Sequence, residues 1–179
     1  MKQKQHTRRA FTLLELLMVI GIIACLASLM MPALTAVRQK ADGIACVSNL
    51  RQIGIAAQLY AGEHSQTTPV IEPWPSDPIY PAGAGAQTIL AALQPYGVTA
   101  ATLRCRADLN GPNYDAKEGS SYEWCPMANG QNVRSVKLVW SGNLPSITLS
   151  QLLMAFDYSN VHSNASNVLF GDGHVAAGN

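Results

Sequence analysis

The chain has 179 residues, with 12 basic and 11 acidic side chains and a formal net charge of +1. This length allows one domain beside a short accessory segment and leaves little room for two. Beyond residue 10 no basic patch argues for nucleic-acid binding, so no nucleic-acid partner is expected.

Residues 11–31 form a nearly uninterrupted apolar stretch. Its polar or thiol side chains are Thr12, Glu15, Cys25 and Ser28. At about 1.5 Å per residue, a helix of this length spans the roughly 30 Å hydrocarbon core of a bilayer. Four positively charged side chains precede it: Lys2, Lys4, Arg8 and Arg9. This asymmetry predicts a single-pass inner-membrane protein with a cytoplasmic N-terminus and an extracytoplasmic head.

Glu15 is the one acidic residue of this apolar stretch. A carboxylate inside a membrane needs a positively charged partner. Cleavage between Ala10 and Phe11 would create an α-amine that can serve as this partner. Removal of the four leading positive charges would leave 8 basic against 11 acidic side chains, a net charge of −3. Ala10 and Phe11 are therefore the candidate processing residues, and Glu15 is the candidate assembly residue.

The same residues resemble the N-terminus of type IV pilins and type II secretion pseudopilins. In that family a basic leader ends in a small residue, usually Gly, the mature chain begins with Phe, and Glu follows at its fifth position. The resemblance implies a leader over residues 1–10, a filament-core helix over 11–31, N-methylation of Phe11 and a structural subunit that is not an enzyme. It also implies the partners: prepilin peptidase/N-methyltransferase, other pilin-like subunits, an inner-membrane assembly platform and membrane lipid.

Three other interpretations of the N-terminus are open. Arg8 and Arg9 suit a twin-arginine export signal, and residues 22–25 suit a lipobox with Cys25 as the lipidated residue. A plain signal anchor would make Glu15 incidental. Glu15 inside the apolar stretch, and apolar residues continuing to Met31, disfavour the first two.

The helical pattern continues beyond the membrane, over residues 32–62. Apolar residues recur at steps of three or four, as expected for one face of an amphipathic helix. They are Leu34, Val37, Ala41, Ile44, Val47, Leu50, Ile53, Ala57 and Tyr60. One helix is predicted over residues 11–61, with a kink at Pro32, weak points at Gly43 and Gly54, and a C-cap at Gly62.

Residues 63–179 are predicted to form a globular head. Residues 63–86 are rich in proline and favour a loop, residues 88–94 a short helix, and residues 108–120 another loop. Strands are expected over residues 121–125, 133–140, 152–156, 167–170 and 174–177. Gly171, Asp172 and Gly173 mark a hairpin between the last two. The predicted fold class is α+β, with a long N-terminal helix packed on a small antiparallel sheet.

Further motifs point to a more specific group within this family. Two parts of the chain resemble a pilin-like set typical of planctomycete- and verrucomicrobial-type bacteria. One is the helical segment of residues 46–54 and 59–60, and the other is His162 followed after nine residues by Asp172 and Gly173. This second resemblance covers both ends of the chain and leaves the middle unmatched.

Four cysteines are present. Cys25 lies in the apolar stretch, where it is expected to be an inert small residue. Cys46, Cys105 and Cys125 allow three alternative disulfides in an oxidising compartment. Cys105 with Cys125 would close a loop within the head, whereas Cys46 with Cys105 would join the helix to the head.

A metal site is a candidate feature of the C-terminal region. Asp157, His162, Asp172 and His174 carry ligand types that suit zinc, and calcium is the alternative cofactor. The competing interpretation is structural: Asp172 and Gly173 form the turn, and His162 makes a hydrogen bond to the backbone of a loop. A second candidate for calcium is the oxygen-rich set Asp108, Asn110, Asn113 and Asp115.

The sequence thus predicts a pilin-like or pseudopilin subunit of a filament. The alternatives are a membrane-anchored metal-dependent hydrolase that uses the His162–His174 region, and an anchored extracytoplasmic binding module that uses Trp74 and Tyr80.

Overall fold

A computed structural model describes residues 12–72, 86–109, 114–134, 136, 147–158 and 166–177. The chain divides into two compact units, one ending at Arg38 and one beginning at Gln39. Helix α1 (Leu13–Glu63) contributes residues to both units, so each unit is described by itself.

The first unit consists of the N-terminal part of α1. Every described residue from 12 to 38 is exposed. By length and composition, α1 can cross a membrane, with a mean hydropathy of 2.5 in its most apolar window. Pro32 lies inside the helix and cannot donate a backbone hydrogen bond. The Thr35 hydroxyl donates to the carbonyl of Met31 at 3.1 Å. The predicted kink at Pro32 stays a prediction.

The second unit combines the C-terminal part of α1 with a four-stranded antiparallel sheet in the order β1-β2-β3-β4. Its strands are β1 (Tyr122–Trp124), β2 (Leu153–Asp157), β3 (Asn167–Phe170) and β4 (Val175–Ala177). Its short helices are α2 (Ile89–Leu93), α3 (Arg106–Leu109) and α4 (Tyr114–Glu118), with 3₁₀ turns η1 (Gln94–Tyr96), η2 (Pro126–Ala128) and η3 (Leu149–Gln151). The predicted α+β class is confirmed.

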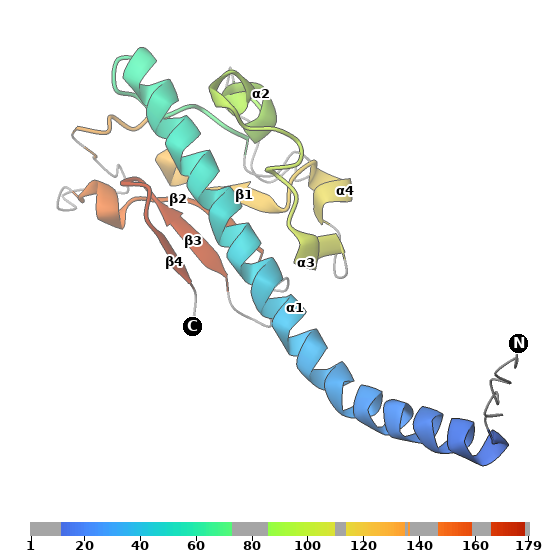
Figure 1. The fold of residues 1–179 in the computed structure, drawn as a ribbon. Coiled ribbons are helices and arrows are strands. Elements are labelled where there is room, and N and C mark those ends of the chain that lie inside the picture. The colour runs from blue at the N-terminus through green and yellow to red at the C-terminus, as the bar shows by residue number, and fades with distance from the viewer. Residues whose placement is uncertain are drawn as a thin grey trace, which may run out of the picture. The chain divides into compact units, whose positions relative to one another are not determined.

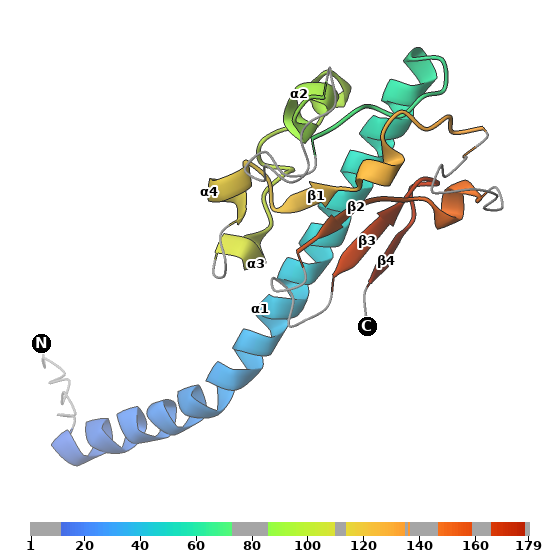
Figure 2. The same cartoon turned by 180° about the vertical axis from the view of Figure 1, so that it is seen from behind.

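Helix α1 packs across one face of this sheet, and α2, α3 and α4 lie toward the β1 edge (Figures 1 and 2). Cys46, Leu50, Ile53 and Ala57 are buried, and they recur at steps of three or four along α1. Gly54 lies on the same face, where an added Cβ would stand 2.8 Å from a methyl carbon of Leu169 in β3. A side chain at position 54 would therefore have to displace the Leu169 methyl group.

The buried face differs from the predicted stripe at its N-terminal end. Leu50, Ile53 and Ala57 are buried as predicted, but Ile44 is 71% exposed. The reason is geometric: the predicted stripe runs through several steps of three, and each step of three rotates about 60° backward around an α-helix. Ile44 therefore lies about 120° away from Leu50. Cys46, four residues before Leu50, occupies the buried position instead.

The predicted C-cap at Gly62 is wrong. Helix α1 continues through Gly62 to Glu63, and the left-handed residues are Ser65 and Gln66, at φ 54° and 62°. The N–H of Gln66 donates to the carbonyl of Ala61 at 2.8 Å, as in a Schellman ending.

The strands predicted over residues 121–125, 152–156, 167–170 and 174–177 correspond to β1–β4 within two residues at each end. The turn between β3 and β4 contains Gly173 at φ 89°, which favours glycine. The strand predicted over residues 133–140 does not begin as expected, because Val133 and Arg134 lie in a turn. Residues 135 and 137–140 lie outside the described residues.

Two segments that the sequence predicts to be loops contain additional structure. Residues 108–120 are not a simple loop, because α3 ends and α4 lies within them. The cause is Asp108, whose carboxylate accepts the backbone N–H groups of Tyr114 and Asp115 at 2.9 Å each and so caps the first turn of α4. In the Pro-rich segment, residues 73–85 lie outside the described residues, while Thr67 and Ile71 form isolated bridges with Asn132 and Gln87. The helix predicted over residues 88–94 is present as α2, with Thr88 as its N-cap.

Two glycines of α1 provide a matched test of the helix–sheet packing. Gly43→Ala meets no atom within 4 Å, so it should raise the free energy of unfolding by up to about 1 kcal/mol through helix propensity. Gly54→Ala has the same propensity gain, but it must displace the fully buried Leu169. Overpacking of this kind costs about 1–3 kcal/mol, so a net loss of stability is expected.

The measurement is thermal unfolding of the full chain in detergent micelles, followed by near-ultraviolet circular dichroism. Leu169→Val in the Gly54→Ala background should recover part of the loss, because it removes the obstructing methyl group. Equal stabilisation by both alanine substitutions would contradict the packing argument.

Candidate functional site

Glu15 lies in the first turn of α1 and forms a capping box with Thr12. The Glu15 carboxylate accepts the backbone N–H and the hydroxyl of Thr12 at 2.9 Å each, and the N–H of Glu15 donates to the Thr12 hydroxyl oxygen at 3.2 Å. These reciprocal bonds satisfy backbone donors that a helix N-terminus otherwise leaves without partners. Ala10 and Phe11, the candidate processing residues, lie outside the described residues.

Thr12 is a site residue that the sequence analysis missed. The spacing Thr12-x-x-Glu15, just before an apolar run, is the signature of a capping box and could have identified it. Thr12 fixes the position of the Glu15 carboxylate relative to the start of the helix. The Glu15 carboxylate is therefore held beside the backbone N–H of Thr12.

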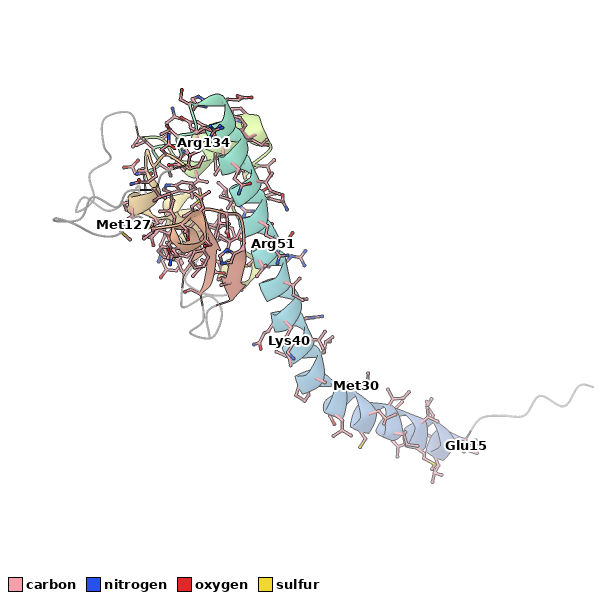
Figure 3. All side chains as sticks on the ribbon, turned by 90° about the vertical axis from the view of Figure 1, so that its left-hand side faces the viewer. Glu15, Met30, Lys40, Arg51, Met127 and Arg134 are labelled. Carbon is pink, nitrogen blue, oxygen red and sulfur yellow. A yellow bond between two sulfur atoms is a disulfide. The ribbon has the colours of Figure 1, made fainter. Side chains whose placement is uncertain are left out.

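The apolar side chains of α1 from Leu16 to Val37 are all exposed. The exposed segment, residues 13–37, carries Leu and Ile side chains of which the most exposed is Leu13, at 82%. Figure 3 shows the side chains around Met30 projecting on all sides of the helix. A contiguous apolar surface of this extent marks a membrane- or protein-contacting surface.

The disulfide joins Cys46 of α1 to Cys105, with their Cα atoms 5.6 Å apart. Of the three pairings left open by the sequence, the structure contains Cys46 with Cys105, which ties the helix to the head. Asn49 reinforces this attachment, because its amide donates to the Arg104 carbonyl at 3.2 Å and to the Tyr122 hydroxyl at 3.1 Å. The part of α1 around Cys46 and Asn49 is therefore attached to the rest of the head by a covalent bond and by neighbouring hydrogen bonds.

The two remaining cysteines are not bonded to each other. Cys25 is exposed on α1, and Cys125 is buried. Burial raises the pKa of the Cys125 thiol, so the reactive thiolate form is disfavoured at neutral pH.

The structure separates the residues of the predicted C-terminal metal site. Asp157 is fully buried at the end of β2, where its two oxygens accept the backbone N–H and the side-chain amide of Asn167 at 2.6 Å each. Asp172 and His174 lie at the other end of β3. Their clustering with Asp157 is therefore wrong, and His162 lies outside the described residues. Within the described ranges, no three His, Cys, Asp or Glu side chains could hold one metal ion.

Asp172 instead serves the turn between β3 and β4. One of its carboxylate oxygens accepts the backbone N–H of His174 at 3.1 Å and contacts the His174 Nδ1 at 2.5 Å. Burial acts to raise the pKa of Asp172, but the hydrogen bonds from His174 outweigh it and hold that pKa below its usual value. The structural interpretation of Asp172 and Gly173 is thus confirmed.

The oxygen-rich set around Asp108 also has structural roles. Asp108 is fully buried and accepts the Ser121 hydroxyl at 2.7 Å in addition to its two backbone bonds to α4. Asp115 pairs with Arg104 at 2.8 Å. Asn110 and Asn113 lie outside the described residues.

These features define a class of protein: an apolar helix with an acid in its first turn, joined to a small α+β head. A family model described as the prokaryotic N-terminal methylation motif matches residues 5–31. The matched residues contain the candidate cleavage site, Glu15 and most of the exposed segment. The predicted prepilin-type N-terminus is confirmed.

The chain is also similar to the type II secretion system core protein G of Pectobacterium carotovorum subsp. carotovorum. The two are 33% identical over 92 residues, which cover 45% of this chain and 58% of that protein. The chain thus spans about three fifths of the relative's length. No solved structure matches this chain. The motif and this similarity support a pilin-like subunit of a type II secretion system or a type IV pilus.

Loss of the disulfide should destabilise the head. In the entropic model, a cross-link between residues 59 positions apart contributes about 4 kcal/mol, so Cys46→Ala combined with Cys105→Ala should lower the free energy of unfolding by roughly that amount. Cys25→Ser, at an exposed cysteine outside the bond, is the matched control and should leave unfolding unchanged.

The pairing itself is checked by alkylating the denatured, unreduced protein and mapping the modified peptides by mass spectrometry. Cys25 and Cys125 should react, and Cys46 and Cys105 should be protected. Protection of Cys125 would contradict the structure.

Proposed function

We propose that this chain is a pilin-like structural subunit, cleaved between Ala10 and Phe11, methylated at Phe11 and assembled through α1 into a filament. The observation that carries the proposal is the coincidence of the N-terminal methylation motif over residues 5–31 with a helical segment, residues 13–37, whose apolar side chains are all exposed. Such a segment is stable in a membrane or in contact with other apolar helices. A subunit that is stored in the membrane and then added to a filament meets these two environments one after the other.

Glu15 would direct the transfer between these environments. In an apolar helix bundle an ionised carboxylate requires a partner, since water no longer solvates it. The α-amine of a neighbouring subunit's Phe11 is a cation of the right sign at the right end of the helix. The capping box supports this role, because it places the Glu15 carboxylate at the N-terminal end of α1 in the single subunit.

The proposal includes location and partners. Lys2, Lys4, Arg8 and Arg9 before the apolar segment favour a cytoplasmic N-terminus and an extracytoplasmic head. The Cys46–Cys105 disulfide agrees with this placement, because such bonds persist in oxidising compartments. The partners are then prepilin peptidase/N-methyltransferase, other pilin-like subunits, an inner-membrane assembly platform and lipid.

Between the two kinds of filament, we favour a type II secretion pseudopilus. The name of the Pectobacterium relative supports this choice, and its 33% identity extends beyond the N-terminal motif. Recovery of the chain from long surface fibres would favour a type IV pilus instead.

Processing is tested by mass spectrometry of the protein isolated from membranes. The expected N-terminal peptide begins at Phe11 and carries one added methyl group. An isolated chain that retains Met1 and still functions, or one that carries lipid on Cys25, would contradict the proposal.

The role of the Glu15 charge is tested by two substitutions that separate charge from capping. Glu15→Gln removes the negative charge but keeps a side chain that can complete the capping box. Glu15→Ala removes both. We expect both variants to be cleaved and to reach wild-type levels in the membrane but to enter filaments at least tenfold less, since each lacks the partner for the Phe11 amine.

Thr12→Ala is the complementary control. It weakens the start of the helix by about 1 kcal/mol but keeps the charge, so assembly should be reduced much less than in Glu15→Gln. Wild-type filament yield from Glu15→Gln, quantified by immunoblotting of sheared or detergent-resistant assemblies, would refute the charge-pairing mechanism.

A further inference from the structure

The outer face of α1 in the head, which is the side opposite the sheet, carries large apolar side chains. Ile44, Ile55 and Leu59 are 71%, 58% and 53% exposed. At about 100° per residue, these three lie within about 60° of one another around the helix axis. Ile55 lies about 160° away from the buried Ile53 and Ala57. Figure 1 shows α1 in front of the sheet, with none of the labelled helices and strands on its near side.

This outer face lacks the charged side chains that a solvent-facing helix surface normally carries. In the described part of the second unit, three of the five exposed large apolar side chains lie on it, and the other two are Val70 and Met127. Its remaining side chains are small or uncharged, and all are exposed: Ala41, Ser48, Gln52 and Gly62. An apolar face of this kind marks a contact with another protein.

The spacing along the outer face suits a second helix that lies alongside α1. Ala41, Ser48, Ile55 and Gly62 recur every seven residues. Because an α-helix drifts only about 20° per seven residues, these positions form a nearly straight line along α1. A surface of this shape is matched along its length by another helix, and small residues let the two backbones come close. In the function proposed above α1 is the assembly helix, so a second copy of the chain supplies such a helix.

Charged side chains flank the outer face on both sides. Arg51 lies about 40° from Ile55 on one side, and Glu63 lies about 80° from Ile55 on the other. In the described part of the chain Arg51 makes no hydrogen bond or ion pair, and Figure 3 shows it on the side of α1 that faces away from the strands. One Glu63 oxygen accepts the Tyr96 hydroxyl at 2.8 Å, which leaves the carboxylate room for a cation. Within one copy the two charges are twelve residues apart, about 18 Å along the helix, so they cannot pair with each other.

One displacement of a parallel second copy matches both the charged and the apolar side chains. If the second helix is displaced by twelve residues, Arg51 of the first copy lies level with Glu63 of the second. The same displacement brings Ile44 level with the space between Ile55 and Leu59 of the second copy. The flanks also agree, because opposite flanks of two parallel helices face each other, as the e and g positions of a coiled coil do. Without a displacement, Arg51 would lie level with Arg51 of the second copy, and like charges repel.

We propose that the outer face of α1 binds the outer face of a second copy of this chain, parallel to it and displaced by about 18 Å along the helix axis, with Arg51 of one copy paired to Glu63 of the next. A displaced contact uses different residues on the two copies, so it repeats without closing and generates a filament. The proposal rests on the filament function proposed above, and it adds the face, the register and the ion pair of the contact.

The register is tested by cysteine cross-linking of filaments made from the full chain in a Cys25→Ser background. Ile44→Cys combined with Leu59→Cys should give a ladder of disulfide-linked multimers on oxidation with copper phenanthroline, because position 44 of each copy meets position 59 of the next. Each of the two substitutions alone should give little cross-linked product. Ile44→Cys combined with Val70→Cys, a residue outside the outer face, is the matched control and should give no ladder.

The ion pair is tested by charge reversal in the same double-cysteine chain. Arg51→Glu and Glu63→Arg should each lower the ladder yield about tenfold, because each brings like charges together. The two reversals combined should restore most of the yield, although these side chains cannot meet within one copy. Tyr96→Phe removes the internal hydrogen bond of Glu63 and should leave the ladder unchanged.

Efficient dimers from Ile44→Cys alone would place the two copies in register and overturn the proposal. A ladder that the single charge reversals leave unchanged, or cross-linking of Ile44→Cys to a different protein, would also overturn it. The N-terminal peptide of the same filaments separates this contact from the function on which it rests. Filaments that begin at Phe11 but give no ladder would overturn the contact alone, whereas failure to form any filament would overturn the proposed function and the contact with it.

Discussion

Burial of one face of α1 on the sheet is the contact on which the head depends. Leu50, Ile53 and Ala57 fill the helix side of the core, and Gly54 lets the helix come close enough for Leu169 to pack against its backbone. The Cys46–Cys105 bond fastens the same stretch of helix at its N-terminal side. The sheet is small, with strands of three to five residues, so without this helix its inner face would be exposed to water.

The same helix has two kinds of surface along its length, and the proposed function is based on this difference. From residue 46 onward one face is buried in the head, whereas from Leu13 to Val37 every side chain is exposed although most are apolar. The hydrophobic effect makes an isolated subunit of this kind unfavourable in water. In the proposed function, membrane insertion and helix bundling remove that surface from water, and the Glu15 carboxylate finds a partner only in the helix bundle.

Local sequence signals predicted much of this structure. The hairpin at Gly171–Gly173 and the apolar helix were found because each is encoded by neighbouring residues, and the prepilin-type N-terminus because its residues stand at fixed spacing. The errors have different origins. The sequence pattern places Ile44 on the buried face, but repeated steps of three carry it away from the side of the helix that contains Cys46 and Leu50. Residues near Asp108 looked like a loop because the caps that stabilise α4 come from a side chain six residues away.

The sequence by itself determined the membrane-length helix, the acid in its first turn, the cleavage motif and the α+β class, since these depend on composition and short-range order. Only the tertiary structure decided which cysteine pairs with Cys46 and that Asp157 lies at the other end of β3 from Asp172. These facts depend on tertiary contacts between segments more than ten residues apart, and short-range sequence patterns do not encode such contacts.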